Sequence, residues 1–132
     1  MPVRSKSTPR MRFGVSHAKG AKFVGGGLRD FFVYRDLGIA AATSGRYGAT
    51  VIRAKRACKG GTGRHRHKLG FQMIYILKGW AKFDYDGQGI VTLRRGSCAH
   101  QPPGIHHELI ACSKGCEIIE ITAPAEFTTA PV

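Results

Sequence analysis

The sequence predicts an all-β domain, either a barrel or a sandwich, with a basic arm before it. From Phe31 onward the chain consists of short runs that are rich in β-branched and aromatic residues. Glycine and aspartate separate these runs at regular intervals. Because no stretch of a dozen residues carries a continuous apolar stripe at the helical period, little helix is expected. The 132 residues fit one domain with a modest core.

Residues 1–27 form the predicted arm, and the folded domain is expected to span 28–132. The arm is rich in glycine, serine, lysine and arginine and shows no sustained period. No acidic residue precedes Asp30. Such an arm could bind phosphate groups, direct the protein to an organelle or keep it soluble. Of these three roles we favour solubility.

The strands are expected at residues 31–34, 47–56, 71–77, 80–85 and 117–122. Turns are expected at residues 60–63, 78–79, 84–87, 95–96 and 114–115. Short strands with regular turns are typical of a barrel or a sandwich. The tail, residues 123–132, contains two prolines and either packs across the barrel or extends freely.

The composition predicts a soluble, cytoplasmic protein with no membrane partner. No apolar run approaches the roughly 20 residues that cross a bilayer, and the N-terminus lacks the apolar stretch of a secretory signal. The 21 lysines and arginines outnumber the 8 acidic residues, which gives a formal net charge of +13. Nothing indicates an oxidising compartment, so free thiols are expected at Cys58, Cys98, Cys112 and Cys116.

Three histidines form the candidate metal site. His65 and His67 are one residue apart, so on a strand both side chains point to the same face. His107 follows about forty residues later, directly behind a turn at Pro102-Pro103-Gly104. Imidazole is the commonest protein ligand of transition metals. The three histidines are therefore expected to bind one metal ion.

Basic residues surround this histidine pair. On a strand, Arg64, Arg66 and Lys68 would alternate with the histidines and form the opposite, solvated face. Their positive field could still draw an anionic substrate toward the site. Nucleic acid is the less favoured partner, because no aromatic residues interleave with the cations as stacking platforms would.

The spacing of these residues resembles that of the cupin superfamily. The first cupin motif runs from His-x-His through four residues to an acidic ligand and through six more to a glycine, which here are Gln72 and Gly79. The second motif opens at Gly96 and ends in Pro-x-Gly-x-x-His at 102–107. The resemblance covers 47–122 and implies a double-stranded β-helix, a jelly-roll β-barrel. It implies a divalent Fe, Mn, Ni, Zn or Cu ion bound by His65, His67, Gln72 and His107.

Gln72 departs from the cupin pattern, in which most metal-binding members carry glutamate. A ligand set of neutral imidazoles and a neutral amide leaves a divalent ion with its full charge. Such an ion is a stronger Lewis acid and favours an anionic substrate, such as a carboxylate or an enolate. Because an amide oxygen is a weaker ligand than a carboxylate, weaker retention of the ion is also expected.

Alternation along the expected strands predicts the pocket and the outer face. Counting in steps of two from the ligands places four apolar residues in the pocket: Ile74, Ile76, Phe83 and Leu109. The opposite face carries Phe71, Met73, Tyr75 and Leu77 and is too apolar to remain in water. Since cupins commonly pair their outer sheets, we expect a homodimer.

Two classes of function stay open at this point. One is a metalloenzyme of the dioxygenase, isomerase or lyase type that acts on a small, anionic organic substrate. The other is a non-catalytic cupin module that binds a small molecule or a metal and has an acidic or nucleic-acid partner. No catalytic acid or base is assigned, because His106 and Glu108 are expected to point away from the site.

Overall fold

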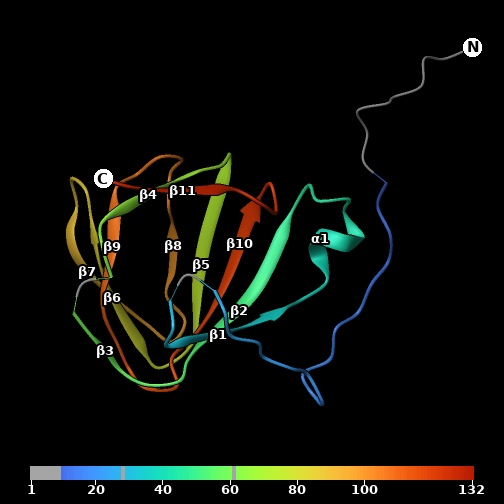
Figure 1. Ribbon diagram of the computed structural model, residues 1–132, viewed down its shortest axis with the longest axis horizontal. Helices are drawn as coiled ribbons and strands as arrows, with labels where there is room; N and C mark the ends of the chain where they lie inside the picture. Colours follow the sequence, from blue (N-terminus) through green and yellow to red (C-terminus); the bar gives the residue numbers. More distant parts are fainter. Residues whose placement is uncertain (1–9, 28, 61) are drawn as a thin grey trace, which may run out of the picture.

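The computed structural model describes residues 10–27, 29–60 and 62–132 and shows two antiparallel sheets that face each other (Figure 1). The first sheet has the order β1-β2-β10-β5-β8, with β1 at Phe32–Asp36, β2 at Gly48–Ala54, β10 at Glu117–Ala123, β5 at Phe71–Lys78 and β8 at Cys98–His100. The second has the order β11-β4-β9-β6-β7, with β11 at Thr128–Pro131, β4 at His65–Lys68, β9 at His107–Cys112, β6 at Trp80–Tyr85 and β7 at Gly89–Arg94. A short strand, β3 (Cys58–Lys59), also pairs with β9.

The predicted fold class is confirmed, because strands form nearly all of the regular structure. The one helix among the described residues, α1 (Ile39–Ala42), is a single turn between β1 and β2. All five expected turns contain a glycine with positive φ, among them Gly79 at 70° and Gly87 at 78°. At Gly79 an added Cβ would also lie 2.3 Å from Oγ of Ser113, so the turn before β6 requires glycine.

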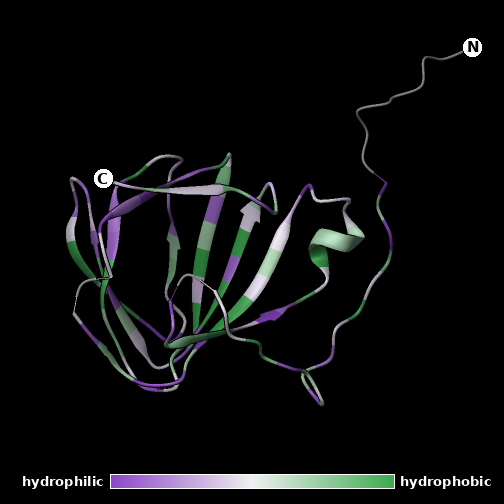
Figure 2. Ribbon diagram, in the orientation of Figure 1, coloured by the Kyte–Doolittle hydropathy of each residue, from purple (hydrophilic) through white to green (hydrophobic). Residues whose placement is uncertain are grey.

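The core lies between the two sheets. Strands β5 and β10 contribute Ile74, Ile76 and Ile118 from one sheet, while Phe83 and Leu109 come from the other, and all five side chains are buried. Figure 2 shows hydrophobic and hydrophilic residues alternating along these strands, as expected for strands with one face in a core. Burial of each such side chain contributes roughly 1.5–3 kcal/mol.

The described part of the predicted arm, 10–27, lies beside the first sheet. Val24 forms an isolated bridge with Tyr34 of β1, through two backbone hydrogen bonds of 2.8 Å. The guanidinium group of Arg53 lies 3.8 Å from the centre of the Phe23 ring. This end of the arm is therefore anchored on the sheet. The basic residues Arg4 and Lys6 lie outside the described residues.

All four cysteines are free thiols, as predicted, and only Cys98 is exposed. No helix in the described part of the chain is long and apolar enough to cross a membrane. The cytoplasmic location stays a prediction.

Candidate metal centre

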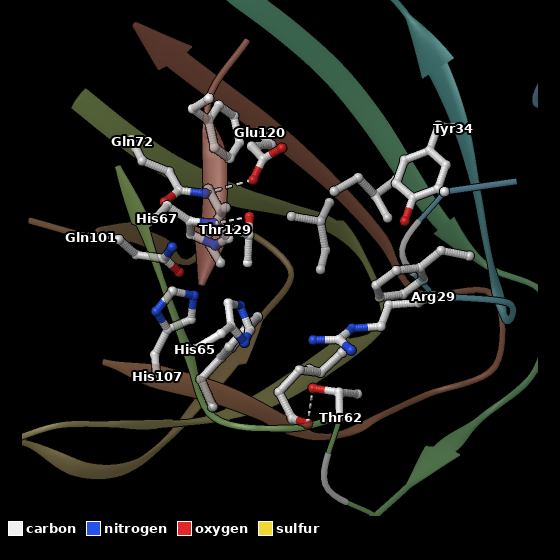
Figure 3. Close-up of a pocket in the computed structure, with 18 residues that line it drawn as sticks. Arg29, Tyr34, Thr62, His65, His67, Gln72, Gln101, His107, Glu120 and Thr129 are labelled. Carbon is white, nitrogen blue, oxygen red and sulfur yellow. Dashed lines mark hydrogen bonds between the residues drawn. The ribbon is translucent and has the colours of Figure 1, made fainter. Parts of the chain in front are cut away.

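The three histidines lie together on the inner face of the second sheet (Figure 3). Position 65 on β4 pairs directly with position 107 on β9, which brings the two imidazole rings to 4.5 Å between centroids. His67 lies two residues further along β4, with its ring 4.8 Å from that of His65 and 5.0 Å from that of His107. The potential ligand atoms of all three lie within 4.8 Å of one another. Strand alternation and strand pairing thus build one cluster from two distant parts of the sequence.

Backbone carbonyl groups fix two of the rings. Nδ1 of His65 lies 2.8 Å from the carbonyl oxygen of Gly63, and Nδ1 of His107 lies 3.0 Å from that of Ile105. Because a carbonyl oxygen only accepts hydrogen bonds, Nδ1 donates in both cases. In a neutral imidazole the lone pair is then on Nε2, which leaves that atom free to bind a metal.

The third ring is held by the C-terminal tail. Strand β11 pairs with β4 and places Thr129 opposite His67. The hydroxyl oxygen of Thr129 lies 2.8 Å from Nδ1 of His67, and the ring of Phe127 packs edge-on against the same imidazole at 5.2 Å. Of the two alternatives for the tail, the structure shows the packed one. The tail forms one wall of the site.

Burial keeps the three imidazoles neutral at physiological pH. Burial, together with the smaller effect of neighbouring histidines, lowers the pKa of both His67 and His107 to about 4. Burial also lowers the pKa of His65, although its hydrogen bond to Gly63 opposes part of this change. Neutral imidazole is the form that binds metals, so the cluster needs no proton loss before an ion can bind near pH 7.

The donor set fits a divalent transition metal. Three imidazoles with oriented Nδ1 atoms are a common arrangement for zinc, iron, nickel and copper. A metal–imidazole bond is about 2.0–2.1 Å long, and the potential ligand atoms of the three imidazoles lie within 4.8 Å of one another. His65, His67 and His107 are therefore a group that can hold a metal.

Gln72 lies on the facing sheet beside this cluster, and its partner is a carboxyl group that the sequence argument did not include. Nε2 of Gln72 donates a hydrogen bond of 2.7 Å to Oε2 of Glu120 on β10 (Figure 3). Burial raises the pKa of Glu120, and the hydrogen bond from Gln72 opposes part of this rise. The amide oxygen of Gln72 is left for other contacts. The carboxyl group of Glu120 is thus hydrogen-bonded to Gln72. When ionised, it would offset part of the positive charge that a divalent ion keeps in a purely neutral ligand set.

The histidines open onto a cavity of about 360 Å³ between the two sheets. Its wall is mainly apolar and includes three of the predicted pocket residues, Ile74, Phe83 and Leu109. Ile76 does not line this cavity, because it lies two residues deeper along β5 and is fully enclosed in the core. Strand alternation predicts the face on which a side chain lies but gives no information on how far along the strand the cavity extends.

A second buried pair of polar groups includes one residue of the cavity lining, Gln101. The phenol of Tyr85 donates a hydrogen bond of 2.6 Å to Oε1 of Gln101, and both residues are buried. Burial raises the pKa of Tyr85, so its hydroxyl group keeps its proton. The hydrogen bond uses the amide oxygen of Gln101, and its amide group lies on the lining of the cavity that His107 also lines.

Several other charged or polar residues near the two motifs are not part of the histidine cluster. Glu108 faces outward and accepts a hydrogen bond of 3.0 Å from the backbone nitrogen of Gly63. His100 is exposed and stacks on the ring of Phe71. Along β4, half-buried histidines alternate with the exposed residues Arg66 and Lys68, as expected from the period of a strand.

Arg29, Glu120 and Thr129 line the site and were missed in the sequence argument. A charged residue within the run Ile118-Ile-Glu-Ile121, on the same parity as Ile118, was a usable signal for Glu120. Thr129 and Arg29 gave no such signal. One lies in a tail and the other in a loop, and their places depend on tertiary packing.

The family model of the cupin domain matches residues 57–122, which is half of the chain. No curated protein sequence matches the chain. Many solved structures share its fold. The polyketide cyclase RemF from Streptomyces resistomycificus has a TM-score of 0.71 and 21% identity, with 91% of this chain and 85% of that chain covered.

Two further structures show the same fold at lower identity. KdgF from Halomonas sp. has a TM-score of 0.69 and 15% identity over 86% of this chain and 96% of its own. A salicylate 1,2-dioxygenase from Pseudaminobacter salicylatoxidans has a TM-score of 0.62 and 8% identity over 78% of this chain and 31% of its own. At these identities the likeness concerns the fold.

Proposed function

The chain belongs to the cupin family, and from this premise we propose that it is a metal-dependent enzyme that converts a small, anionic organic substrate. The observation that carries the proposal is the cluster of His65, His67 and His107, neutral and oriented, at one wall of an apolar cavity. In this proposal Gln72 completes the ligand set through its amide oxygen, while its amide nitrogen stays on Glu120.

A bound divalent ion would supply Lewis-acid activation of a substrate oxygen or, if it is iron, a site for dioxygen. The protein contributes the rest. The carbonyl groups of Gly63 and Ile105 and the hydroxyl of Thr129 orient the imidazoles. The apolar wall excludes water, which strengthens every charge interaction inside the cavity. The reaction is then of the dioxygenase, isomerase or lyase type.

Metal analysis tests this function directly. The purified protein, reconstituted in turn with Fe, Mn, Ni, Zn and Cu, is desalted and its metal content is measured by elemental analysis. We expect one ion per chain for the wild type and for the control His17→Ala. His17 is an exposed residue of the arm and is not part of the histidine cluster. His67→Ala is expected to lose most of the ion. A wild type that retains no stoichiometric metal would contradict the proposal.

We further propose that two copies pair through the outer face of β5. Three of its side chains, Phe71, Tyr75 and Leu77, remain exposed by 39%, 38% and 37%. They form an alternating apolar stripe on one face of the strand, which is a common interface pattern.

Light scattering at micromolar concentration tests the dimer. We expect a dimer mass for the wild type and a monomer mass for Tyr75→Lys combined with Leu77→Lys. The control is Ile90→Lys, because Ile90 is 64% exposed on β7 of the other sheet and should leave the dimer intact. A wild type that is monomeric throughout would rule out this pairing.

A further inference from the structure

Arg29 places a positive charge inside the cavity that the three histidines share. It belongs to the connection before β1, is half-buried and lines the cavity. Figure 3 shows its guanidinium group beside Thr62 and pointing toward His65. Its positive charge also lowers the pKa of all three histidines, which agrees with this placement.

Arg29 has no anionic partner among the described residues, whereas three other arginines do. Arg53 pairs with Glu117 at 2.8 Å, Arg56 with Asp30 at 3.3 Å and Arg64 with Asp84 at 3.3 Å. A charge inside an apolar cavity is costly unless a counter-charge or hydrogen bonds compensate it. The unpaired guanidinium group therefore favours the entry of an anion.

Gly27, Arg29 and Asp30 each contact another part of the described chain. A Cβ atom at Gly27 would lie 2.3 Å from Cε1 of Tyr34, so only glycine lets the chain pass this closely over the ring. The carbonyl oxygen of Arg29 accepts a hydrogen bond from the backbone nitrogen of Phe32 at 3.2 Å. The next residue, Asp30, forms an exposed ion pair with Arg56. The guanidinium group thus projects from an anchored backbone.

The other lining residues indicate which kind of organic anion fits the cavity. Most of the remaining lining is apolar and includes Phe32, Ile52 and Leu109. A cavity of about 360 Å³ lies at the small end of the range for organic ligands. The cavity therefore suits an anionic group attached to a compact apolar body.

We propose that Arg29 is the specificity-determining residue of this site and binds the carboxylate of a small, mainly apolar organic acid whose body extends toward the histidines. This assignment rests on the proposed function. The planar guanidinium group matches a carboxylate in a bidentate arrangement. Arg29 is the only lysine or arginine among the described lining residues, which also include Glu120. A cavity lined by one cation and one acidic group suits a monoanion better than a phosphate dianion.

Calorimetric titration with three probes tests the carboxylate site. Benzoate, the neutral isostere benzamide and phenyl phosphate are each titrated into the metal-reconstituted protein. The variants are Arg29→Gln, Arg29→Lys and the control Arg95→Gln, whose arginine is exposed in the turn before β8. Elemental analysis and circular dichroism of each variant establish its metal content and its fold.

We expect the wild type and Arg95→Gln to bind benzoate at least about tenfold more tightly than either other probe. Arg29→Gln should lose this preference with its metal content unchanged. Arg29→Lys keeps the positive charge but not the bidentate geometry of the guanidinium group, so it should retain part of the preference. Equal benzoate affinity in Arg29→Gln and the wild type would overturn the proposal. Tighter binding of phenyl phosphate would also overturn it.

The same titrations distinguish a failure of the metal proposal from a failure of the anion site. If the wild type binds no metal, the same titrations are made with the metal-free protein. An Arg29-dependent preference for benzoate there would support the anion site and contradict the metalloenzyme. An absence of this preference in both forms would overturn the anion site.

Discussion

Thr129 shows how a single residue outside the histidine cluster acts on it. Its hydroxyl group lies 2.8 Å from Nδ1 of His67, whose other nitrogen is then directed to the site. His65 and His107 depend on backbone carbonyl groups for the same purpose, which no substitution of a side chain removes. Thr129 is therefore the one orienting contact of the three that mutation can remove.

We predict that Thr129→Ala lowers metal affinity by at least about tenfold, because His67 loses the partner that holds its ring. The neighbouring Thr128→Ala, on the same strand with an exposed side chain and no hydrogen bond to a histidine, is the matched control. Competition with a chromogenic chelator measures both affinities. Equal affinities in the two variants would show that Thr129 has no orienting role.

Gln72 and Glu120 form a hydrogen-bonded pair, in which the amide group of Gln72 donates to the carboxyl group of Glu120. In metal-free protein, Gln72→Glu would place a second carboxyl group beside that of Glu120 and remove the amide that now donates to it at 2.7 Å. We predict a loss of about 2 kcal/mol in the free energy of unfolding at pH 7. Adding Glu120→Gln should restore most of it, since an amide then again donates to a carboxylate. Urea unfolding of the four proteins completes the cycle.

Single residues of the site differ in how far the sequence could predict them. The pairing of His65, His67 and His107 follows from strand alternation and the family spacing, and the structure brings the three together. Glu120 was predictable from its parity in an apolar run. Arg29 was not predictable, because it lies in a loop outside every strand and its place beside the histidines is a tertiary feature with no local signal.

At the scale of elements, three buried thiols lie on or near strands β3 and β9. Position 58 pairs with position 112 across the two strands, and Cys116 lies buried in the core cluster nearby. Burial raises the pKa of Cys58, that of Cys112 to about 11 and that of Cys116 to about 12. The thiolate is the reactive form. These three thiols are therefore protected from reagents in two ways, because they are buried and because they stay protonated.

We predict one rapidly reacting thiol per folded chain in an Ellman assay at pH 8 and four after denaturation. Cys98→Ser should remove the rapid reaction, because Cys98 is the exposed cysteine. The folded state keeps its thiol protons to a higher pH than the unfolded state, so the free energy of unfolding should fall as the pH rises above about 9. Rapid reaction of a second thiol would indicate that this part of the core opens readily.

The elements that the sequence predicted are those with an apolar pattern. The expected run 71–77 corresponds to β5 and the run 117–122 to β10, each within a residue of its observed ends. Strand β4, with the sequence His-Arg-His-Lys, has no apolar side chain to reveal it. Its strand conformation depends on pairing with β9 and β11, which a local pattern does not encode.

At the scale of the whole molecule, a bound ion would connect the two sheets. The histidines belong to the second sheet and Gln72 to the first, so a shared ion would add a link across the core. A ligand that binds only the folded state stabilises it by about 2.7 kcal/mol at a hundred times its dissociation constant. A protein with such an ion should therefore be more resistant to heat.

We predict that stoichiometric metal raises the melting temperature by several degrees and that EDTA reverses the increase. His107→Ala should melt at the same temperature with and without metal, since the cluster has lost a ligand. Differential scanning calorimetry at constant protein concentration measures the shifts. An equal metal-induced shift in His107→Ala would place the stabilising ion elsewhere.

The position of Arg29 in the chain has an evolutionary consequence. The groups that can bind the ion lie on β4, β5 and β9, inside the sheets, where substitutions disturb the core. Arg29 lies on the connection before β1, outside every strand. Under the proposed function, mutations in one connecting segment would change the substrate preference and leave the metal-binding residues unchanged. Related chains that share the histidines but differ in this segment would then be expected to act on different acids.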